Sequence, residues 1–203
     1  MRGIFRLLSS LLVLASVASV ALSQSTGGES TGGGGGYGGE SNYDAPLKQA
    51  LTPKAATKIV TQLTDAAEYC EWIPDEYVVD CLADQYAKIE RSLPRGGDYS
   101  EVRKVIGGTA KSLQSIAKKY SNGAKAVVTK RPPAGKFATS ATRALIPVPK
   151  QAQRKAVQSA NRVVAEATTL LLRSGEQSAA RRAPFQKIAS ALGDSNKVLL
   201  RAI

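Results

Sequence analysis

The chain has 203 residues, a formal net charge of +12, two cysteines and no histidine. The absence of histidine excludes Ser-His-Asp and Cys-His catalysis and removes the commonest zinc ligand. The charge is divided unevenly, because residues 24–100 carry net −6 whereas residues 101–203 carry net +16. A field of one sign over half of a chain attracts anionic partners.

Residues 1–23 have the layout of a secretory signal peptide. Arg2 and Arg6 precede an apolar run from Leu7 to Ala21, and the small residues Ala21 and Ser23 match an A-x-A-like cleavage site. We expect cleavage after Ser23, with Ala21 as the second choice. The alternative is an uncleaved anchor, which we disfavour because serines interrupt a run already shorter than the ~20 apolar residues of a membrane span. The mature protein is therefore expected to be secreted or periplasmic, without a transmembrane segment.

Residues 24–45 are rich in glycine and serine and are expected to form a flexible, disordered leader. The remainder, residues 46–203, shows apolar residues at helical spacing and no convincing strand pattern. We therefore predict an all-α domain, an irregular bundle of four or five helices with one intrachain disulfide.

The helix boundaries follow from local signals along the chain. Thr52 is expected to cap the first helix, which ends by Ile73 because the residue before a proline avoids helical geometry. The second helix is expected from Pro74 to Leu93, and the third begins at a capping-box-like pattern with Asp98 as its cap. Asn122-Gly123 is expected to end the third helix, and the fourth is expected from Lys150 to Arg173, with Leu170 facing inward. The fifth helix is expected to start near Pro184 and is either continuous or broken at Gly193-Asp194.

Two stretches depart from a regular helical pattern. Gly107-Gly108 falls inside the third helix, where close packing against a neighbouring helix is favoured over a hinge. The connection from Ala124 to Lys150 is rich in proline and basic residues, and only Thr139 to Ile146 is compatible with a short helix. A connection of this length is either functional or a strap over the bundle, held by Val127, Val128, Phe137, Leu145 and Ile146.

Cys70 and Cys81 lie on either side of the break at Ile73-Pro74. In an exported chain, two cysteines predict one disulfide. A metal site is disfavoured because the usual four ligands are missing, and a redox site because there is no Cys-x-x-Cys. Cys81 lies further from the break than Cys70, so we expect either that the first helix unwinds before Cys70 or that the two helices cross at an angle.

The predicted function is that of a non-enzymatic binding or scaffold protein without a cofactor. Its basic half is expected to contact an anionic polymer, lipid headgroups or an acidic protein, and no motif for sequence-specific binding of nucleic acid is found. The candidate anion-binding residues are Lys125, Lys130, Arg131, Lys136, Arg154, Lys155, Arg181 and Arg182.

The alternative function is a carboxylate-based hydrolase that acts on glycans. Such an enzyme needs two carboxylates facing one sugar bond, and an aromatic platform would help to hold the sugar. The stretch from Glu68 to Leu93 is expected to form a disulfide hairpin, two helices folded back on each other and joined by the disulfide. Its candidate acids are Glu68, Glu71, Asp75, Glu76, Asp80 and Asp84, and its aromatic residues are Trp72, Tyr77 and Tyr86. A membrane-active role for the basic face of Lys150 to Arg173 is disfavoured, because its apolar face is rich in alanine and lacks Trp and Phe.

Overall fold

The computed structural model describes residues 49–126, 140–141 and 143–203. Over these residues the chain forms five α-helices and one 3₁₀-helix, and no strand. The elements are α1 Pro53–Trp72, η1 Asp75–Tyr77, α2 Val78–Ser92, α3 Asp98–Tyr120, α4 Lys150–Gly175 and α5 Ala179–Arg201. The predicted all-α bundle is confirmed, whereas the predicted signal peptide and leader lie outside the described residues.

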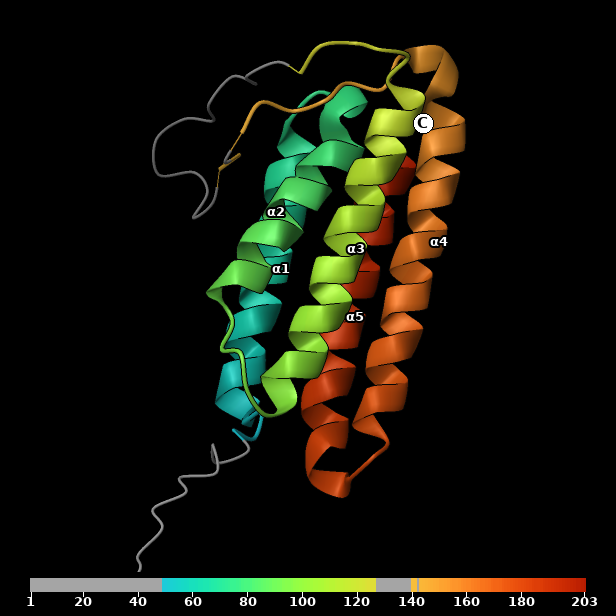
Figure 1. The fold of residues 1–203 in the computed structure, drawn as a ribbon. Helices are drawn as coiled ribbons and strands as arrows, with labels where there is room; N and C mark the ends of the chain where they lie inside the picture. Colours follow the sequence, from blue (N-terminus) through green and yellow to red (C-terminus); the bar gives the residue numbers. More distant parts are fainter. Residues whose placement is uncertain (1–48, 127–139, 142) are drawn as a thin grey trace, which may run out of the picture. The chain divides into compact units, whose positions relative to one another are not determined.

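The helices form a closed ring around one core. Each helix packs against its neighbour in the chain, and α1 also packs against α5 (Figure 1). Successive helices run in opposite directions, so α1 and α5 run the same way, and an ion pair between Glu71 and Arg201 joins their C-terminal ends. All five helices contribute buried apolar side chains to the core, among them Ile59, Leu82, Ile106, Val164 and Ile188.

The start and end of α1 are as predicted. Thr52 Oγ1 accepts a hydrogen bond from the amide of Ala55 at 3.2 Å, and Pro53 occupies the first helical position, where its missing N–H costs nothing. Ile73 is extended, with φ −85° and ψ 161°, as expected for the residue before Pro74. Local sequence signals are therefore sufficient to define this helix.

Cys70 and Cys81 form the predicted disulfide, with their Cα atoms 5.7 Å apart. The helix α2 begins at Val78, four residues later than predicted, because Pro74 is extended and residues 75–77 form the 3₁₀ turn. Cys70 therefore lies in the last turn of α1 and Cys81 in the first turn of α2. Of the two predicted alternatives, the unwinding before Cys70 does not occur, because α1 stays helical through Trp72.

The turn between α2 and α3 is packed against the residues that precede α1. Gly97 has φ 58° and ψ −141°, and a Cβ atom there would lie 2.3 Å from the backbone nitrogen of Gln49. The prediction of Asp98 as the helix cap is wrong, because Gly97 holds that position and Asp98 is the first helical residue. The carboxylate of Asp98 is used elsewhere: it accepts the amide of Leu51 at 3.1 Å and pairs with Arg181 Nε at 3.1 Å.

The helix α3 ends at Tyr120, just before the predicted stop at Asn122 and Gly123, which have φ of 51° and 77°. The described residues of the predicted short helix, 140–141 and 143–146, are not helical. Instead, residues 140–141 and 143–149 cross one end of the bundle, where Leu145 is fully buried, as expected for a strap (Figure 1). The other expected anchors Val127, Val128 and Phe137 lie outside the described residues.

The helix α4 extends to Gly175, two residues past the predicted end. A Cβ atom at Gly175 would lie 2.9 Å from Cβ of Phe185, so a glycine there permits the tight return into α5. Leu170 was predicted to face the core, but it is 51% exposed. Leu171, the next residue, is fully buried in its place.

The helix α5 begins at Ala179, five residues before the predicted start at Pro184. Ser178 caps it, because its side chain accepts from the amide of Arg181 at 3.3 Å. The helix is continuous through Gly193 and Asp194, so the alternative with a break there is wrong. In the described part of the chain, no helix combines the length and apolar character that a bilayer crossing requires.

Candidate functional site

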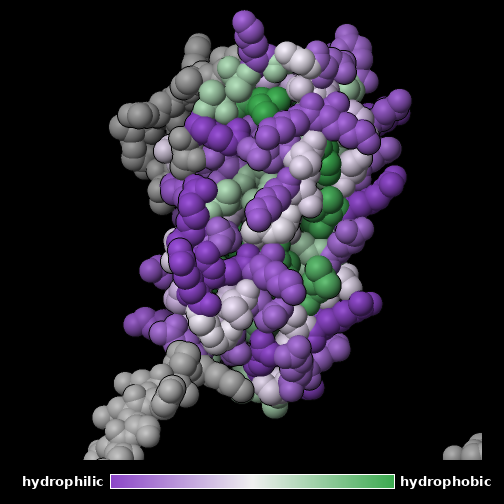
Figure 2. All heavy atoms as spheres, viewed as in Figure 1, coloured by the Kyte–Doolittle hydropathy of each residue, from purple (hydrophilic) through white to green (hydrophobic). Residues whose placement is uncertain are grey.

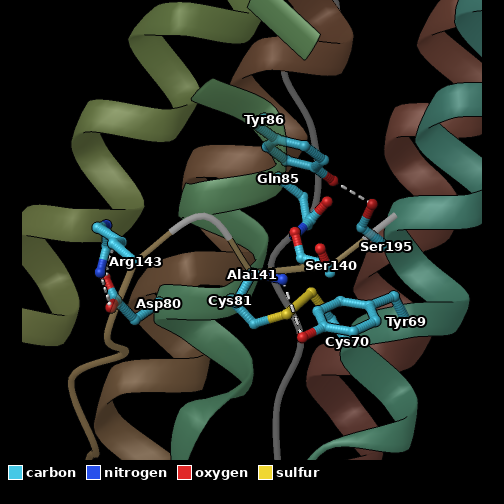
Figure 3. The surroundings of a disulfide bond; sticks show 10 residues. All are labelled: Tyr69, Cys70, Asp80, Cys81, Gln85, Tyr86, Ser140, Ala141, Arg143 and Ser195. Atoms are coloured by element: carbon cyan, nitrogen blue, oxygen red, sulfur yellow. Dashed lines mark hydrogen bonds and ion pairs between the residues drawn. A yellow bond between two sulfur atoms is a disulfide. The ribbon is translucent and has the colours of Figure 1, made fainter. Parts of the chain in front are cut away.

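The strap formed by residues 140–141 and 143–149 is fixed to α2 by a buried ion pair. Asp80 is completely buried and accepts from Arg143 Nη2 at 2.7 Å and from the amide of Ile146 at 2.8 Å (Figure 3). The second terminal nitrogen of Arg143 also bonds to Asp80, and Arg143 Nε lies 3.7 Å from Asp84. The hydrogen bond to Asp80 raises the pKa of the Arg143 guanidinium above its usual range.

The same segment is held beside the disulfide by side chains of α1 and α2. The amide of Ala141 donates to the Tyr69 hydroxyl at 2.9 Å, and Gln85 Nε2 donates to the carbonyl of Ser140 at 2.9 Å (Figure 3). Tyr69 and Gln85 are both buried. The disulfide hairpin is therefore the surface on which the strap is anchored.

These contacts bear on the hydrolase hypothesis. Asp80 and Asp84 are buried beneath Arg143, so neither carboxylate presents a free oxygen pair to a sugar. Glu71 forms an ion pair with Arg201 at the ends of α1 and α5. Tyr86 is fully buried and shares a short hydrogen bond with Ser195 of α5, so it is no aromatic platform. Four of the candidate residues, Glu71, Asp80, Asp84 and Tyr86, therefore join the helices to one another or to the strap, whereas Asp75 and Glu76 line a separate pocket with Pro147 and Lys150.

A groove of about 770 Å³ lies between α2 and α3. Five of its lining residues are alanine or glycine: Ala83, Ala87, Gly107, Gly108 and Ala110. Its basic lining residues are Arg91, Arg95, Arg103, Lys104, Lys111 and Arg143. Hydrophilic residues cover most of the surface over α2 and α3, around paler residues between the two helices (Figure 2). The groove is thus a depression bordered by cations.

The paired glycines of α3 have different surroundings. A Cβ atom at Gly107 would lie 2.9 Å from Cγ of Glu90, so this glycine allows α2 and α3 to approach closely, as the sequence indicated. A Cβ atom at Gly108 would meet nothing within 4 Å. Gly108 therefore has no packing role in the bundle, and its missing side chain leaves the middle of the groove open.

Most of the basic groove residues have no acidic partner. Arg103 is engaged by α2, because it pairs with Glu90 and donates to the carbonyls of Glu90 and Leu93. Arg143 is engaged by Asp80, as described above. Among the described residues, no carboxylate forms an ion pair with the other four, Arg91, Arg95, Lys104 and Lys111. The groove consequently retains four positive charges that the fold itself does not use.

The basic residues singled out from the sequence do not form one surface. Lys130, Arg131 and Lys136 lie outside the described residues. Lys125 is exposed just after α3, and Arg154 and Lys155 are exposed near the start of α4. Arg182 is exposed near the start of α5, at the opposite end of the bundle (Figure 1). Arg181 has a structural role, since it pairs with Asp98 and lies 4.8 Å from the ring centroid of Phe185.

None of the groove's six basic residues was among the anion-binding residues predicted from the sequence. One available signal was the spacing of Lys104 and Lys111, which lie two helical turns apart with Gly107-Gly108 between them. The sequence of the third helix is sufficient to show this face of small residues flanked by cations. The contribution of Arg143 was not visible, because 63 residues separate it from Asp80.

Metal chemistry finds no support in this region, because no group of three or more candidate ligands occurs among the described residues. Comparison with known proteins finds no family model, no curated protein and no solved structure that matches the chain. The class that fold and site define is thus a disulfide-bonded five-helix bundle with a basic groove between α2 and α3.

Proposed function

We propose that this protein is an exported, non-enzymatic binding protein that holds an anionic ligand in the groove between α2 and α3. The observation that carries the proposal is the set of four cations, Arg91, Arg95, Lys104 and Lys111, without acidic partners in the described structure. Arginine and lysine groups gathered around a depression bind anionic oxygens, since each forms charge-assisted hydrogen bonds to them. Export is supported by the disulfide and by the signal-like residues 1–23.

The proposed binding surface is the groove between α2 and α3, which is smaller than the basic C-terminal half predicted from the sequence. The net charge of the C-terminal half points to an anionic partner, and the groove offers a place where several cations converge on one volume. Arg154 and Lys155 of α4 lie at the opposite end of the bundle from Arg182 of α5, so these exposed cations contribute little beyond general electrostatic attraction.

The test is ligand-induced stabilisation of the folded protein. A ligand that binds only the native state raises the free energy of unfolding by about 2.7 kcal/mol when its concentration is a hundred times its dissociation constant. We expect tripolyphosphate and heparin to raise the Tm of the wild-type protein at low salt. We expect the double variant Lys104→Glu, Lys111→Glu to lose this increase.

The matched control is Arg154→Glu with Lys155→Glu, which makes the same change of charge on the exposed face of α4. This control should keep most of the increase in Tm. Equal losses in the two double variants would mean that net charge, and not the groove, attracts the anion. A loss confined to the control would transfer the proposed function to the surface of α4.

A further inference from the structure

We infer that the groove between α2 and α3 binds a linear acidic polysaccharide that lies lengthwise between the two helices. This inference rests on the proposed function and adds the class and the orientation of the ligand. It follows from the length of the groove, from the kind of side chains that line it and from those that are missing.

The cations extend along the groove and are not gathered at one point. On α3 the lining runs from Ser100 to Gln114, which corresponds to about 21 Å at 1.5 Å per residue. Arg95 lies at one end beside the α2–α3 turn, Arg143 lies toward the other end, and Lys104 and Lys111 lie between them. A single phosphate or headgroup would reach only part of this row. A chain with repeated anionic groups reaches all of it.

Nucleic acid and lipid surfaces fit the groove less well. No Phe, Tyr or Trp is among the described residues that line it, so these residues offer the bases of a single strand no aromatic side chain on which to stack. The exposed large apolar side chains of the described chain are on α1, on α4 and at the end of the chain, namely Trp72, Leu170, Leu172, Leu200 and Ile203. None of these lines the groove, so a bilayer that contacted the groove would gain no apolar burial there.

An acidic peptide also fits less well, because of its backbone. An extended peptide carries one N–H donor for each C=O acceptor, and both need partners when they are covered. The described part of the groove offers mainly donors, since its polar lining there consists of Arg, Lys, Gln114 and Ser100, with Asp84 and Glu90 facing arginines. The interior backbone carbonyls of α2 and α3 are used within the helices. The anionic groups and ether oxygens of an acidic polysaccharide are acceptors, which match these donors, and its hydroxyl groups can rotate to donate or to accept.

The experiment measures affinity against ligand length. Size-defined heparin oligosaccharides, from the disaccharide to the octasaccharide, are titrated into the full protein by calorimetry, and oligogalacturonates serve as carboxylate-only counterparts. We expect affinity to rise at each step until the groove is filled. We also expect the salt dependence of binding to steepen with length, because each added ion contact releases counterions.

A second measurement uses the open position at Gly108. The variant Gly108→Leu places a side chain in the middle of the groove, where nothing lies within 4 Å of a new Cβ atom. It should flatten the increase in affinity with length, while Tm stays at or above that of the wild type because leucine favours a helix more than glycine does. The control is Ser190→Leu, at an exposed position of α5 outside the groove lining, which should keep the length dependence.

The possible results separate the inference from the proposed function. Affinity that reaches its maximum at the disaccharide would overturn the inference and leave a groove for single anionic groups. Tighter binding of polyglutamate, a single-stranded oligonucleotide or anionic vesicles than of oligosaccharides with the same charge would also overturn it. Binding of no anion, or binding indifferent to Lys104→Glu and Lys111→Glu, would overturn both the inference and the proposed function.

Discussion

Arg143 covers the buried carboxylate of Asp80, 63 residues earlier in the chain, and donates to it from both terminal nitrogens. Asp80 has no solvent exposure, whereas Arg143 stays partly exposed and also lines the groove. One side chain thus anchors the strap to α2 and borders the candidate ligand site. Stability and binding are expected to be linked through this residue.

Replacing Arg143 with alanine should lower the free energy of unfolding by about 2–3 kcal/mol, because it leaves a buried carboxylate with no cation. The loss stays at the lower end of the range for broken buried pairs, because the amide of Ile146 still donates to Asp80. Urea denaturation followed by circular dichroism measures it. Arg154→Ala, on the exposed face of α4, should change stability by no more than about 0.5 kcal/mol. Equal effects at the two positions would show that the buried pair is unimportant.

The disulfide should contribute about 3 kcal/mol, since it closes a short loop in the unfolded chain. The variant Cys70→Ala, Cys81→Ala should keep its helical circular dichroism signal and unfold at a lower temperature. Both cysteines are fully buried, so the native protein should be reduced only slowly by mild thiols. Mass spectrometry of the unreduced protein checks the pairing itself. Alkylation of both thiols in denaturant without a reductant would contradict it.

Two neighbouring glycines provide a matched pair of substitutions. Gly97 has a positive φ, and a Cβ atom there would clash with the backbone of Gln49, whereas a Cβ atom at Gly96 meets nothing within 4 Å. We expect Gly97→Ala to lower the free energy of unfolding by about 2 kcal/mol or more, from backbone strain and the displaced residues before α1. Gly96→Ala should be close to neutral. Calorimetric Tm values compare the two, and equal Tm values would mean that the contact with Gln49 is absent in solution.

Alkaline stability should depend on Tyr86. Burial raises the pKa of Tyr86 well above its ordinary value of 10.0, although the hydrogen bond with Ser195 opposes part of the shift. Tyr86 therefore stays neutral in the folded protein while the unfolded chain ionises it, so its contribution is complete below pH 10 and declines as the pH rises further. The decline is about 1.4 kcal/mol per pH unit.

The variant Tyr86→Phe isolates this contribution. It should be less stable than the wild type at neutral pH by about 1 kcal/mol, because Ser195 loses its partner in the core. Its disadvantage should shrink above pH 10, since phenylalanine cannot ionise. Urea midpoints measured between pH 8 and about pH 11.5 test this, and parallel pH profiles for the two proteins would contradict it.

The sequence predicted those features that depend on neighbouring residues. The start of α1 at Thr52 and Pro53 follows from a cap and a proline in adjacent positions, and Asn122-Gly123 ends α3 for an equally local reason. Cys70 and Cys81 could be paired because the chain contains no other cysteine. Helical periodicity then identified the core faces of the helices. Leu170 was an error, because it was predicted to be buried and is exposed.

The features that were missed depend on contacts between distant segments. Asp98 has the local pattern of a cap, but its carboxylate is taken by Leu51 and Arg181 from elsewhere in the chain. Asp80 reads as an acid near a helix start, and only the folded strap brings Arg143 to it. The groove combines side chains of α2, the turn, α3 and the strap, so no stretch of the sequence contains it. Periodicity gives the face of a helix that is buried, and it does not give the residues that cover it.

The packing of α1 against α5 has a consequence for the order of folding. These are the first and the last helices of the described chain, so the ring closes only when its most distant segments meet. Contacts between such distant segments raise the contact order and slow folding relative to a bundle with only local helix pairs. A chain emerging from the ribosome holds α1 to α4 before it holds α5, and until then the core face of α1 lacks its partner. The native bundle can therefore form only after the 23 residues of α5 have been synthesised.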